Sequence, residues 1–287
     1  MQFSVLVLLG LVFSSQNQFT KSLINNNMRR RQILRLAQGG IISAFTGGII
    51  ADAANSQTNA TLKLEWLGHM SFLVSGDGVR FLTHPFRPAG CTAKLPAPKA
   101  ASDYILISSR LLDEGYLENL AKDTRVLSEP GSYNIKGLNI QGIAMDHDRI
   151  GGRRFGRNVA WRWKQSGIFV LHLGGAAAPI TQSQRILMGR PDVLILPIGG
   201  NAQSSEPTQA KAYSPEEAKA IVQELNPRIV IPVYYRSDKS SQSCQLASVD
   251  EFLALMPKDS IQKLDGSVLE LSPKNLPQTT VVRVLKA

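Results

Sequence analysis

From Thr61 onward the chain alternates short β-rich segments with glycine-containing turns, and this alternation limits the folds that it can adopt. The turns at residues 76–78 and 165–167, and the glycine at 137, are of the kind that joins antiparallel strands. In the second half of the chain, strand segments alternate with helical ones. A β-rich first half followed by an α/β half predicts two mixed β-sheets packed face to face with helices outside, an αββα sandwich of the α/β class.

The expected strands share apolar or β-branched residues and lie at residues 62–66, 72–74, 79–83, 104–107, 125–127, 133–144, 159–164, 168–172, 192–197, 228–235, 268–271 and 279–285. The spacing of apolar residues predicts helices over 111–121, 181–187, 215–225 and 252–256. Two helices follow capping boxes, in which Ser214 pairs with Glu217 and Ser248 with Glu251. Hydrophobic residues make up 43% of the chain, enough for the core of one large domain, which we assign to residues 54–287.

The charge of the chain favours an anionic partner. Lysine and arginine number 32 against 22 aspartate and glutamate residues, a formal net charge of +10, which suits a small anionic ligand or a lipid headgroup. We expect no nucleic-acid partner, because no segment combines basic and aromatic residues as nucleic-acid modules do. We expect no membrane-spanning helix in the mature chain, because no apolar run reaches about 20 residues. The sequence indicates no particular protein partner.

The first 53 residues are interpreted as an N-terminal extension and signal region. Residues 30–35 read RRQILR, which resembles a twin-arginine export signal, and a mildly apolar stretch and an A-x-A-like cleavage site ending at Ala53 follow it. Met28 is the expected start of translation, and residues 1–27 are then either an over-extended gene prediction or a genuine extension. An uncleaved signal that tethers the protein to a membrane is the alternative to cleavage and export.

Export by this route would deliver the protein to a compartment of the periplasm or thylakoid-lumen type. Disulfides form and persist in oxidising compartments of this kind. The chain has two cysteines, Cys91 and Cys244. They can pair there or remain free thiols, and the sequence leaves both alternatives open.

A series of short motifs lies in a fixed order between residues 62 and 237. They read WLGHMSFL at 66–73, LTHPF at 82–86, ILISS at 105–109, MDHD at 145–148, HLGG at 172–175, LILPIGG at 194–200 and IPVYY at 231–235. Together they resemble the metallo-β-lactamase fold, in the subgroup that includes L-ascorbate-6-phosphate lactonase and the N-acyl-phosphatidylethanolamine phospholipases. The resemblance implies the αββα sandwich and a hydrolysis in which one or two divalent ions, held by His and Asp, activate a water molecule.

The positions that the resemblance assigns to metal ligands are largely substituted in this chain. They are occupied by Ser109, Leu111, Glu114, Gly175 and Tyr234, whereas Asp113 and His147 are kept. Gly175 stands where the resemblance places an aspartate that bridges the metal ions. Leucine and glycine side chains cannot coordinate a metal, and the hydroxyl groups of serine and tyrosine are poor zinc ligands at neutral pH. We therefore expect that the inherited dinuclear site is lost, that no cofactor is tightly bound, and that the protein is a degenerate relative that binds an anionic ligand or a partner.

An active hydrolase of an anionic ester, lactone or phosphodiester is the alternative interpretation. One divalent metal, Zn or Mn, would then be held by a rebuilt set of His69, His84, His147 and Asp113, with His147 and Asp113 as the catalytic residues. A metal-free variant uses His147 as a general base that is oriented by a neighbouring carboxylate, Asp146 or Asp148.

Arginines that follow His147 are candidates for binding a substrate anion. Arg149, Arg153 and Arg154, together with Tyr234, offer the planar guanidinium groups and the hydroxyl that recognise carboxylate or phosphate. The alternative is a solvated hairpin face. Because Trp161 and Trp163 alternate with Arg162, they share one face of a strand and are assigned to the core.

Overall fold

The computed structural model describes residues 60–118, 120–121, 123–200 and 210–286. The expected signal region of residues 1–53, with the start at Met28 and the cleavage site at Ala53, lies outside the described residues. Within the described ranges, the strands form two mixed sheets, as the sequence predicts.

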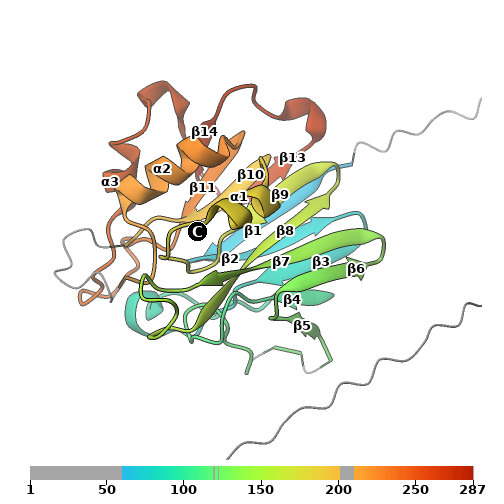
Figure 1. Cartoon of the computed structure of the whole chain (residues 1–287), viewed down its shortest axis with the longest axis horizontal. Helices are drawn as coiled ribbons and strands as arrows, with labels where there is room; N and C mark the ends of the chain where they lie inside the picture. Colours follow the sequence, from blue (N-terminus) through green and yellow to red (C-terminus); the bar gives the residue numbers. More distant parts are fainter. Residues whose placement is uncertain (1–59, 119, 122, 201–209, 287) are drawn as a thin grey trace, which may run out of the picture. The chain divides into compact units, whose positions relative to one another are not determined.

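The six-stranded sheet contains most of the early strands. In spatial order it consists of β13 (Val268–Leu271), β1 (Leu62–Gly68), β2 (Ser71–Gly76), β3 (Val79–Thr83), β4 (Tyr104–Leu106) and β5 (Arg125–Leu127). The pairs from β13 to β3 are antiparallel, whereas β3, β4 and β5 run parallel to one another. Figure 1 shows the successive strands β1, β2 and β3 side by side in this sheet.

The eight-stranded sheet combines a parallel half and an antiparallel half. Its spatial order is β12 (Ile261–Lys263), β14 (Val281–Val284), β11 (Ile229–Val233), β10 (Val193–Pro197), β9 (Ile168–His172), β8 (Arg157–Gln165), β7 (Leu138–Asp146) and β6 (Gly131–Ile135). The strands from β12 to β9 pair in parallel, and those from β9 to β6 pair antiparallel.

Two-residue turns fix the register of the hairpins. In Asp77-Gly78, Lys136-Gly137 and Ser166-Gly167 both residues have positive φ, between 48° and 87°. This combination defines the tight hairpin turn whose twist matches that of the strands, and glycine at its second position adopts positive φ without a steric penalty. The turns that the sequence predicts at these glycines are confirmed.

The main core lies between the two sheets. Strand β1 alternates buried and half-buried residues along its length, so that Leu62 and Leu64 face the core. Trp161 and Trp163 on β8 are 0% and 1% exposed in the same apolar cluster. The Trp161 indole N–H donates to the backbone carbonyl of Ile107 at 3.0 Å, which ties the two sheets together. The assignment of both tryptophans to the core is confirmed.

Helices cover the outer face of the eight-stranded sheet. They are α1 (Gln182–Met188), α2 (Pro215–Leu225) and α3 (Val249–Leu253), and Figure 1 shows α2 and α3 in orange beside β11 and β14. The capping box of Ser214 and Glu217 begins α2, as predicted. Helix α3 begins directly after Ser248 and thus three residues earlier than expected. No helix in the described ranges is long and apolar enough to span a membrane.

The helix expected over residues 111–121 is wrong. The chain makes a single turn there, in which the Glu114 and Gly115 amides both donate to the Leu111 carbonyl, and the Tyr116 amide then donates to the Pro85 carbonyl instead. The apolar spacing serves another purpose, since Leu117 packs with Leu120 on the outer face of the six-stranded sheet. Glu114 of this segment reaches into the interior, and these long-range contacts outweigh the local preference for a helix.

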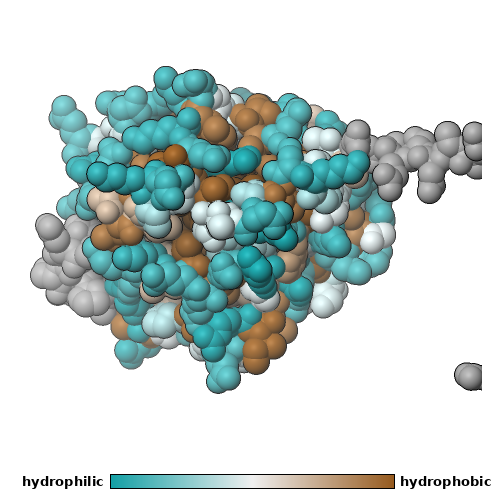
Figure 2. Space-filling view, turned by 90° about the horizontal axis from the view of Figure 1, so that it is seen from above, coloured by the Kyte–Doolittle hydropathy of each residue, from teal (hydrophilic) through white to brown (hydrophobic). Residues whose placement is uncertain are grey.

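Short 3-10 turns and connecting segments complete the described chain. The 3-10 turns are η1 (Gly90–Thr92), η3 (Lys258–Ser260) and η4 (Pro273–Asn275). The face seen in Figure 2 is largely hydrophilic, with hydrophobic residues showing between the hydrophilic ones.

Candidate functional site

The candidate site lies at an edge where several strands end in strained backbone. His69 follows β1, His84 follows β3 and Tyr234 follows β11, and their φ angles are 54°, 47° and 55°. Residues other than glycine seldom adopt positive φ, and such outliers cluster at binding and catalytic sites. The backbone therefore turns these three side chains inward at the cost of local strain.

Glu114 is the centre of a buried polar cluster at this edge. Its carboxylate accepts a hydrogen bond from the Ser108 hydroxyl at 2.8 Å and another from the Ser109 hydroxyl. It also contacts the His147 ring nitrogen Nε2 at 2.7 Å. Glu114 and His147 are each only 1% exposed, so a charged pair is enclosed within the protein.

Electrostatics favour the charged forms of both members of this pair. Burial by itself would raise the pKa of the Glu114 carboxyl, but the charge and hydrogen bond of His147 outweigh it and hold that pKa below its usual value. Burial likewise opposes protonation of His147, yet the carboxylate of Glu114 raises the pKa of the imidazole overall. A buried pair of this kind is held as carboxylate and imidazolium, and removing either partner would strand the other charge.

Gly175 leaves the space that the Glu114 carboxylate fills. A Cβ atom added at Gly175 would lie 2.3 Å from Glu114 Oε2 and 3.0 Å from His147 Nε2. The turn at this position is fixed by Asn158, whose side-chain oxygen accepts from the Gly175 amide at 3.2 Å. The carboxylate that the resemblance places at residue 175 is thus replaced by one that enters from residue 114.

The acidic neighbours of His147 do not orient it. Asp148 accepts hydrogen bonds from the backbone amides of Ile150, Gly152, Arg154 and Phe155 at 2.8–3.0 Å. Burial alone would raise the pKa of Asp148, but these amide donors lower it overall. Asp148 therefore organises the loop after β7, and its neighbour Asp146 is exposed. The side chain that contacts the His147 ring is Glu114, not the adjacent carboxylates considered in the sequence analysis.

The candidate substrate-binding arginines are engaged within their own loop and with α2. Arg149 forms an ion pair with Glu217 at 2.5 Å, and Arg153 donates to the backbone carbonyl of Ile150 at 3.0 Å. Arg154 lies over the ring of Phe155, with 5.3 Å between the guanidinium carbon and the ring centre. None of the three lines the pocket beside Asp113.

Asp113 and Tyr234 meet in that pocket, which has a volume of about 420 Å³. The Tyr234 hydroxyl donates to Asp113 Oδ2 at 2.6 Å, and Lys211 Nζ donates to the same oxygen at 3.2 Å. Although burial opposes it, these partners lower the pKa of Asp113 overall. Arg87 also lines the pocket; no hydrogen bond or ion pair joins its guanidinium to another of the described residues, although its charge acts on Tyr116. Asp113 and the two cations give this pocket a net positive charge.

Sequence reasoning missed Arg87 and Lys211. Arg87 directly follows the LTHPF motif, so its distance from that motif was an available signal. Lys211 lies outside every motif, and only the tertiary structure brings it to Asp113.

The remaining histidines are packed rather than gathered. The His84 ring lies 4.0 Å from the His172 ring, centre to centre, and His69 lies 4.3 Å from the ring of Tyr234. His172 is satisfied on both sides, by the Met70 carbonyl and the Gly174 amide. Burial lowers the pKa of His69 and of His172 to about 4, so both are neutral at pH 7.

A metal of the kind that the resemblance implies does not fit these residues. In the part of the chain that the structure describes, no three His, Cys, Asp or Glu side chains form a group that could hold a metal ion. Buried nitrogens without a protein partner remain on His69, His84 and His147, but these side chains are not brought into one such group with Asp113. The His147 nitrogen that faces the site is occupied by Glu114.

A disulfide borders the site. Cys91 in η1 and Cys244 in the segment after β11 form a covalent bond between residues 153 positions apart. Cys91 lines the pocket beside Asp113 and also a neighbouring one. Of the two alternatives that the sequence leaves open, the structure contains the paired one.

Comparisons with known proteins agree with this architecture. A family model described as a beta-lactamase superfamily domain matches residues 63–234. Proteins named "UPF0173 metal-dependent hydrolase" are 26% identical over 208 residues in Carboxydothermus hydrogenoformans and 27% identical over 212 residues in Heliobacterium modesticaldum. These matches cover 61% of this chain and 85% and 83% of those proteins.

A solved structure from Thermotoga maritima, described as a Zn-dependent hydrolase of the metallo-beta-lactamase superfamily, superposes with a TM-score of 0.61. It is 28% identical, and the match covers 78% of this chain and 100% of that one.

Proposed function

The chain belongs to the beta-lactamase superfamily, and we propose that this member binds a small anion and no longer performs metal-dependent hydrolysis. Its relatives are named metal-dependent hydrolases, so the proposal concerns what distinguishes this chain from them. The observation that carries it is the buried Glu114 carboxylate, which fills the space beside Gly175 and occupies His147.

The first part of the proposal is the loss of the metal. Tight zinc binding needs three or four protein ligands. Of the ligand positions that the resemblance assigns, Leu111 and Gly175 have no side-chain atom that could coordinate a metal. The Tyr234 hydroxyl donates a hydrogen bond to Asp113. His147 would have to break a buried ion pair before it could coordinate, which is unfavourable because Glu114 would lose its partner.

The second part is the anion. Arg87 and Lys211 bring two positive charges to a pocket that is lined by one carboxylate, that of Asp113. Asp113 accepts from both Lys211 and Tyr234 and so fixes the ammonium group, whose remaining protons can serve a ligand. The Arg87 guanidinium, which has no hydrogen-bond or ion-pair partner among the described residues, suits the planar, two-point recognition of phosphate or carboxylate.

A second candidate function, hydrolysis of an anionic ester, lactone or phosphodiester around His147, is favoured by the names of the relatives. A general base must come within hydrogen-bond reach of the proton that it removes. His147 is 1% exposed and its Nε2 atom is held by Glu114, which argues against direct contact with a substrate. The more specific likeness to the lactonase-like subgroup remains a prediction.

Two measurements on the purified protein test the proposal. After incubation with equimolar Zn or Mn and desalting, elemental mass spectrometry should find no stoichiometric metal. Isothermal titration calorimetry should detect inorganic phosphate binding that is weakened at least about tenfold by Arg87→Ala, since a charge-assisted hydrogen bond contributes about 1.5–3 kcal/mol. Arg153→Ala is the matched control, because Arg153 lies outside the pocket. About one metal ion per chain, or equal effects of the two variants, would contradict the proposal.

We also propose that the protein is exported by the twin-arginine route. The RRQILR segment supports this, and so does the disulfide of Cys91 and Cys244, because disulfides persist in oxidising compartments. Replacing Arg30 and Arg31 by lysine should retain the protein in the cytoplasm, as followed by cell fractionation. Unchanged export of the double variant would refute this route, and a membrane-bound product of unreduced size would indicate an uncleaved signal.

A further inference from the structure

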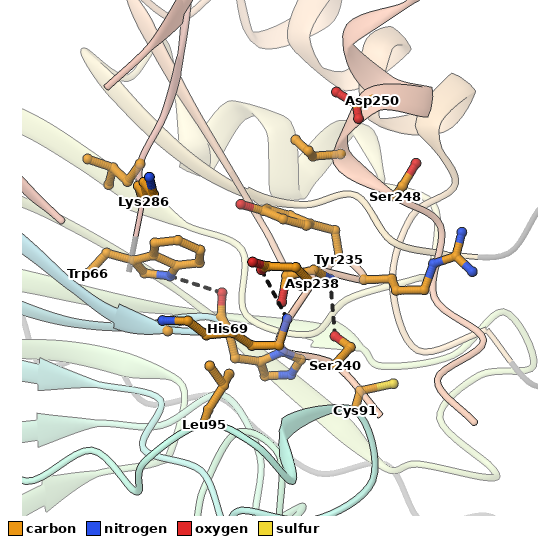
Figure 3. Close-up of a pocket in the computed structure, with 16 residues that line it drawn as sticks. Trp66, His69, Cys91, Leu95, Tyr235, Asp238, Ser240, Ser248, Asp250 and Lys286 are labelled. Carbon is orange, nitrogen blue, oxygen red and sulfur yellow. Dashed lines mark hydrogen bonds between the residues drawn. The ribbon is translucent and has the colours of Figure 1, made fainter. Parts of the chain in front are cut away.

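The pocket lined by Asp113, Arg87 and Lys211 is called the anion pocket below. A second pocket lies next to it and has a different lining. Its volume is about 310 Å³, at the lower end of the range for small-molecule sites. Both pockets are lined by His69 and Cys91, so they are neighbours across these two residues. Figure 3 shows Trp66, Leu95 and Tyr235 around the second pocket, which we call the aromatic pocket.

Aromatic and aliphatic side chains from separate elements line part of it. Trp66 is near the end of β1, Tyr235 follows β11, Leu95 follows η1 and Leu285 follows β14. The rings of Trp66 and Tyr235 are 6.2 Å apart, centre to centre, and are tilted by 35°. Aromatic rings attract one another at such separations in offset or tilted arrangements, so a third ring can join the pair favourably.

The backbone of His69, a residue that also lines the anion pocket, fixes the orientation of the Trp66 indole. The Trp66 indole N–H donates to the backbone carbonyl of His69 at 3.1 Å, a bond drawn as a dashed line in Figure 3. The side chain of His69 in turn lies 4.3 Å from the ring of Tyr234, whose hydroxyl contacts Asp113 in the anion pocket. His69 thus connects Trp66 in the aromatic pocket with Tyr234 in the anion pocket.

Charged residues also line the aromatic pocket. Arg236, Lys239 and Lys286 lie there with Asp238 and Asp250. Burial raises the pKa of Tyr235, and so do these two carboxylates, so its hydroxyl stays protonated at neutral pH. The pocket thus offers the rings of Trp66 and Tyr235 to a planar apolar group, with charged side chains elsewhere in its lining.

We propose that the aromatic pocket receives the ring of an aryl-substituted anion whose anionic group lies in the neighbouring pocket beside Arg87 and Lys211. This inference rests on the proposed anion binding and adds the class of ligand: an aryl phosphate or aryl carboxylate. Trp66 and Tyr235 contact the ring, and Leu95 closes the pocket on the side of η1.

Three probes separate the contributions of the two pockets in isothermal titration calorimetry with the purified protein. They are 1-naphthyl phosphate, inorganic phosphate and 1-naphthol. The aryl phosphate should bind at least about tenfold more tightly than inorganic phosphate, because ring stacking and burial add to the phosphate contacts. The variant Trp66→Leu should remove this difference, so that it binds 1-naphthyl phosphate no more tightly than inorganic phosphate.

Further variants keep the test decisive if Trp66→Leu disturbs the core. Leu95→Ser changes a half-buried residue outside the strands and should weaken 1-naphthyl phosphate binding severalfold. Leu187→Ser is its matched control, since Leu187 is a 44% exposed residue of α1 that lines neither pocket. Octyl phosphate is the control ligand, and it should bind more weakly than 1-naphthyl phosphate.

The outcomes distinguish this inference from the proposed function on which it rests. Equal affinities for 1-naphthyl phosphate and inorganic phosphate would overturn the aromatic pocket and leave anion binding intact. An equal or higher affinity for octyl phosphate, or an unchanged preference in Trp66→Leu, would also overturn it. Binding of 1-naphthol that Trp66→Leu abolishes, with no binding of inorganic phosphate, would support the ring site and refute the anion pocket. No binding of any probe would refute both.

Discussion

Returning an aspartate to residue 175 should destabilise this protein, although the resemblance places one there. In Gly175→Asp the new Cβ would lie 2.3 Å from Glu114 Oε2, closer than Cβ atoms approach other atoms in folded proteins. The Glu114 carboxylate cannot move aside freely, because Ser108, Ser109 and His147 hold it in a buried position.

The expected loss of stability combines a steric and an electrostatic contribution. Overpacking of a filled interior costs about 1–3 kcal/mol. Two like charges about 4 Å apart repel by about 4 kcal/mol at an effective dielectric constant of about 20, a value that the nearby imidazolium of His147 reduces. We therefore expect Gly175→Asp to lower the free energy of unfolding by about 3–5 kcal/mol, a large share of the usual 5–15 kcal/mol. Gly175→Ala should lose only the steric part.

Urea denaturation, followed by circular dichroism, measures these losses. Gly266→Asp is the matched control, because a Cβ at Gly266 meets no atom within 4 Å, and its effect should stay within about 0.5 kcal/mol. Glu114→Ala alone should cost about 3–5 kcal/mol, since it leaves His147 without its partner. In the double variant Glu114→Ala/Gly175→Asp the carboxylate returns from the other side, and the combined loss should be at least about 2 kcal/mol smaller than the sum of the single losses.

Two results would refute this reasoning. One is a Gly175→Asp variant that is as stable as Gly266→Asp, which would mean that Glu114 does not fill the space beside residue 175. The other is strictly additive losses in the double variant, which would mean that the two positions do not exchange one carboxylate.

Three further predictions concern the disulfide, the pH dependence and the loop after β7. The double variant Cys91→Ser/Cys244→Ser should lose about 2–4 kcal/mol in urea denaturation, because the bond closes a loop of 153 residues; a loss below about 0.5 kcal/mol would contradict this. Burial lowers the pKa of His172 from 6.5 to about 4, so that on acidification the unfolded chain takes up a proton before the folded one does. The free energy of unfolding should therefore fall by about 3 kcal/mol between pH 6.5 and 4. His172→Gln should show a shallower fall with pH, and an equal fall in the variant and the unaltered protein would count against this assignment. Asp148→Asn should cost about 1–3 kcal/mol and increase amide hydrogen exchange over residues 150–155, whereas Asp146→Asn at the exposed neighbour should leave both unchanged.

Local signals identified most of the strands, the hairpins and the start of α2 in this protein. Turns such as Asp77-Gly78 and the Ser214–Glu217 capping box depend on residues a few positions apart, so their geometry follows from the sequence alone. The segment 111–121 did not follow its local pattern. Its apolar residues pack on the sheet, and Glu114 must reach the interior, so long-range packing overrides the helical spacing.

The residue types at the positions that the resemblance assigns to metal ligands are likewise read from the sequence, and Leu111 and Gly175 there have no side-chain atom that could coordinate a metal. Which residues surround His147 and Asp113 is not evident there. The Glu114–His147 pair joins residues 33 positions apart, and Lys211 reaches Asp113 across 98 positions. The sequence also offered Arg149, Arg153 and Arg154 as binding residues, and they are engaged elsewhere because Asp148 folds their loop on itself.

The sequence by itself therefore determined most of the strands and hairpins and the two-sheet sandwich, because these depend on residue identity and on spacing along the chain. Only the tertiary structure decided that the Glu114 carboxylate fills the space beside Gly175, that the two cysteines pair, and that Arg87 and Lys211 rather than the arginine-rich loop line the pocket. Those outcomes depend on distances between strand ends that lie far apart in the chain, and no local pattern encodes such distances.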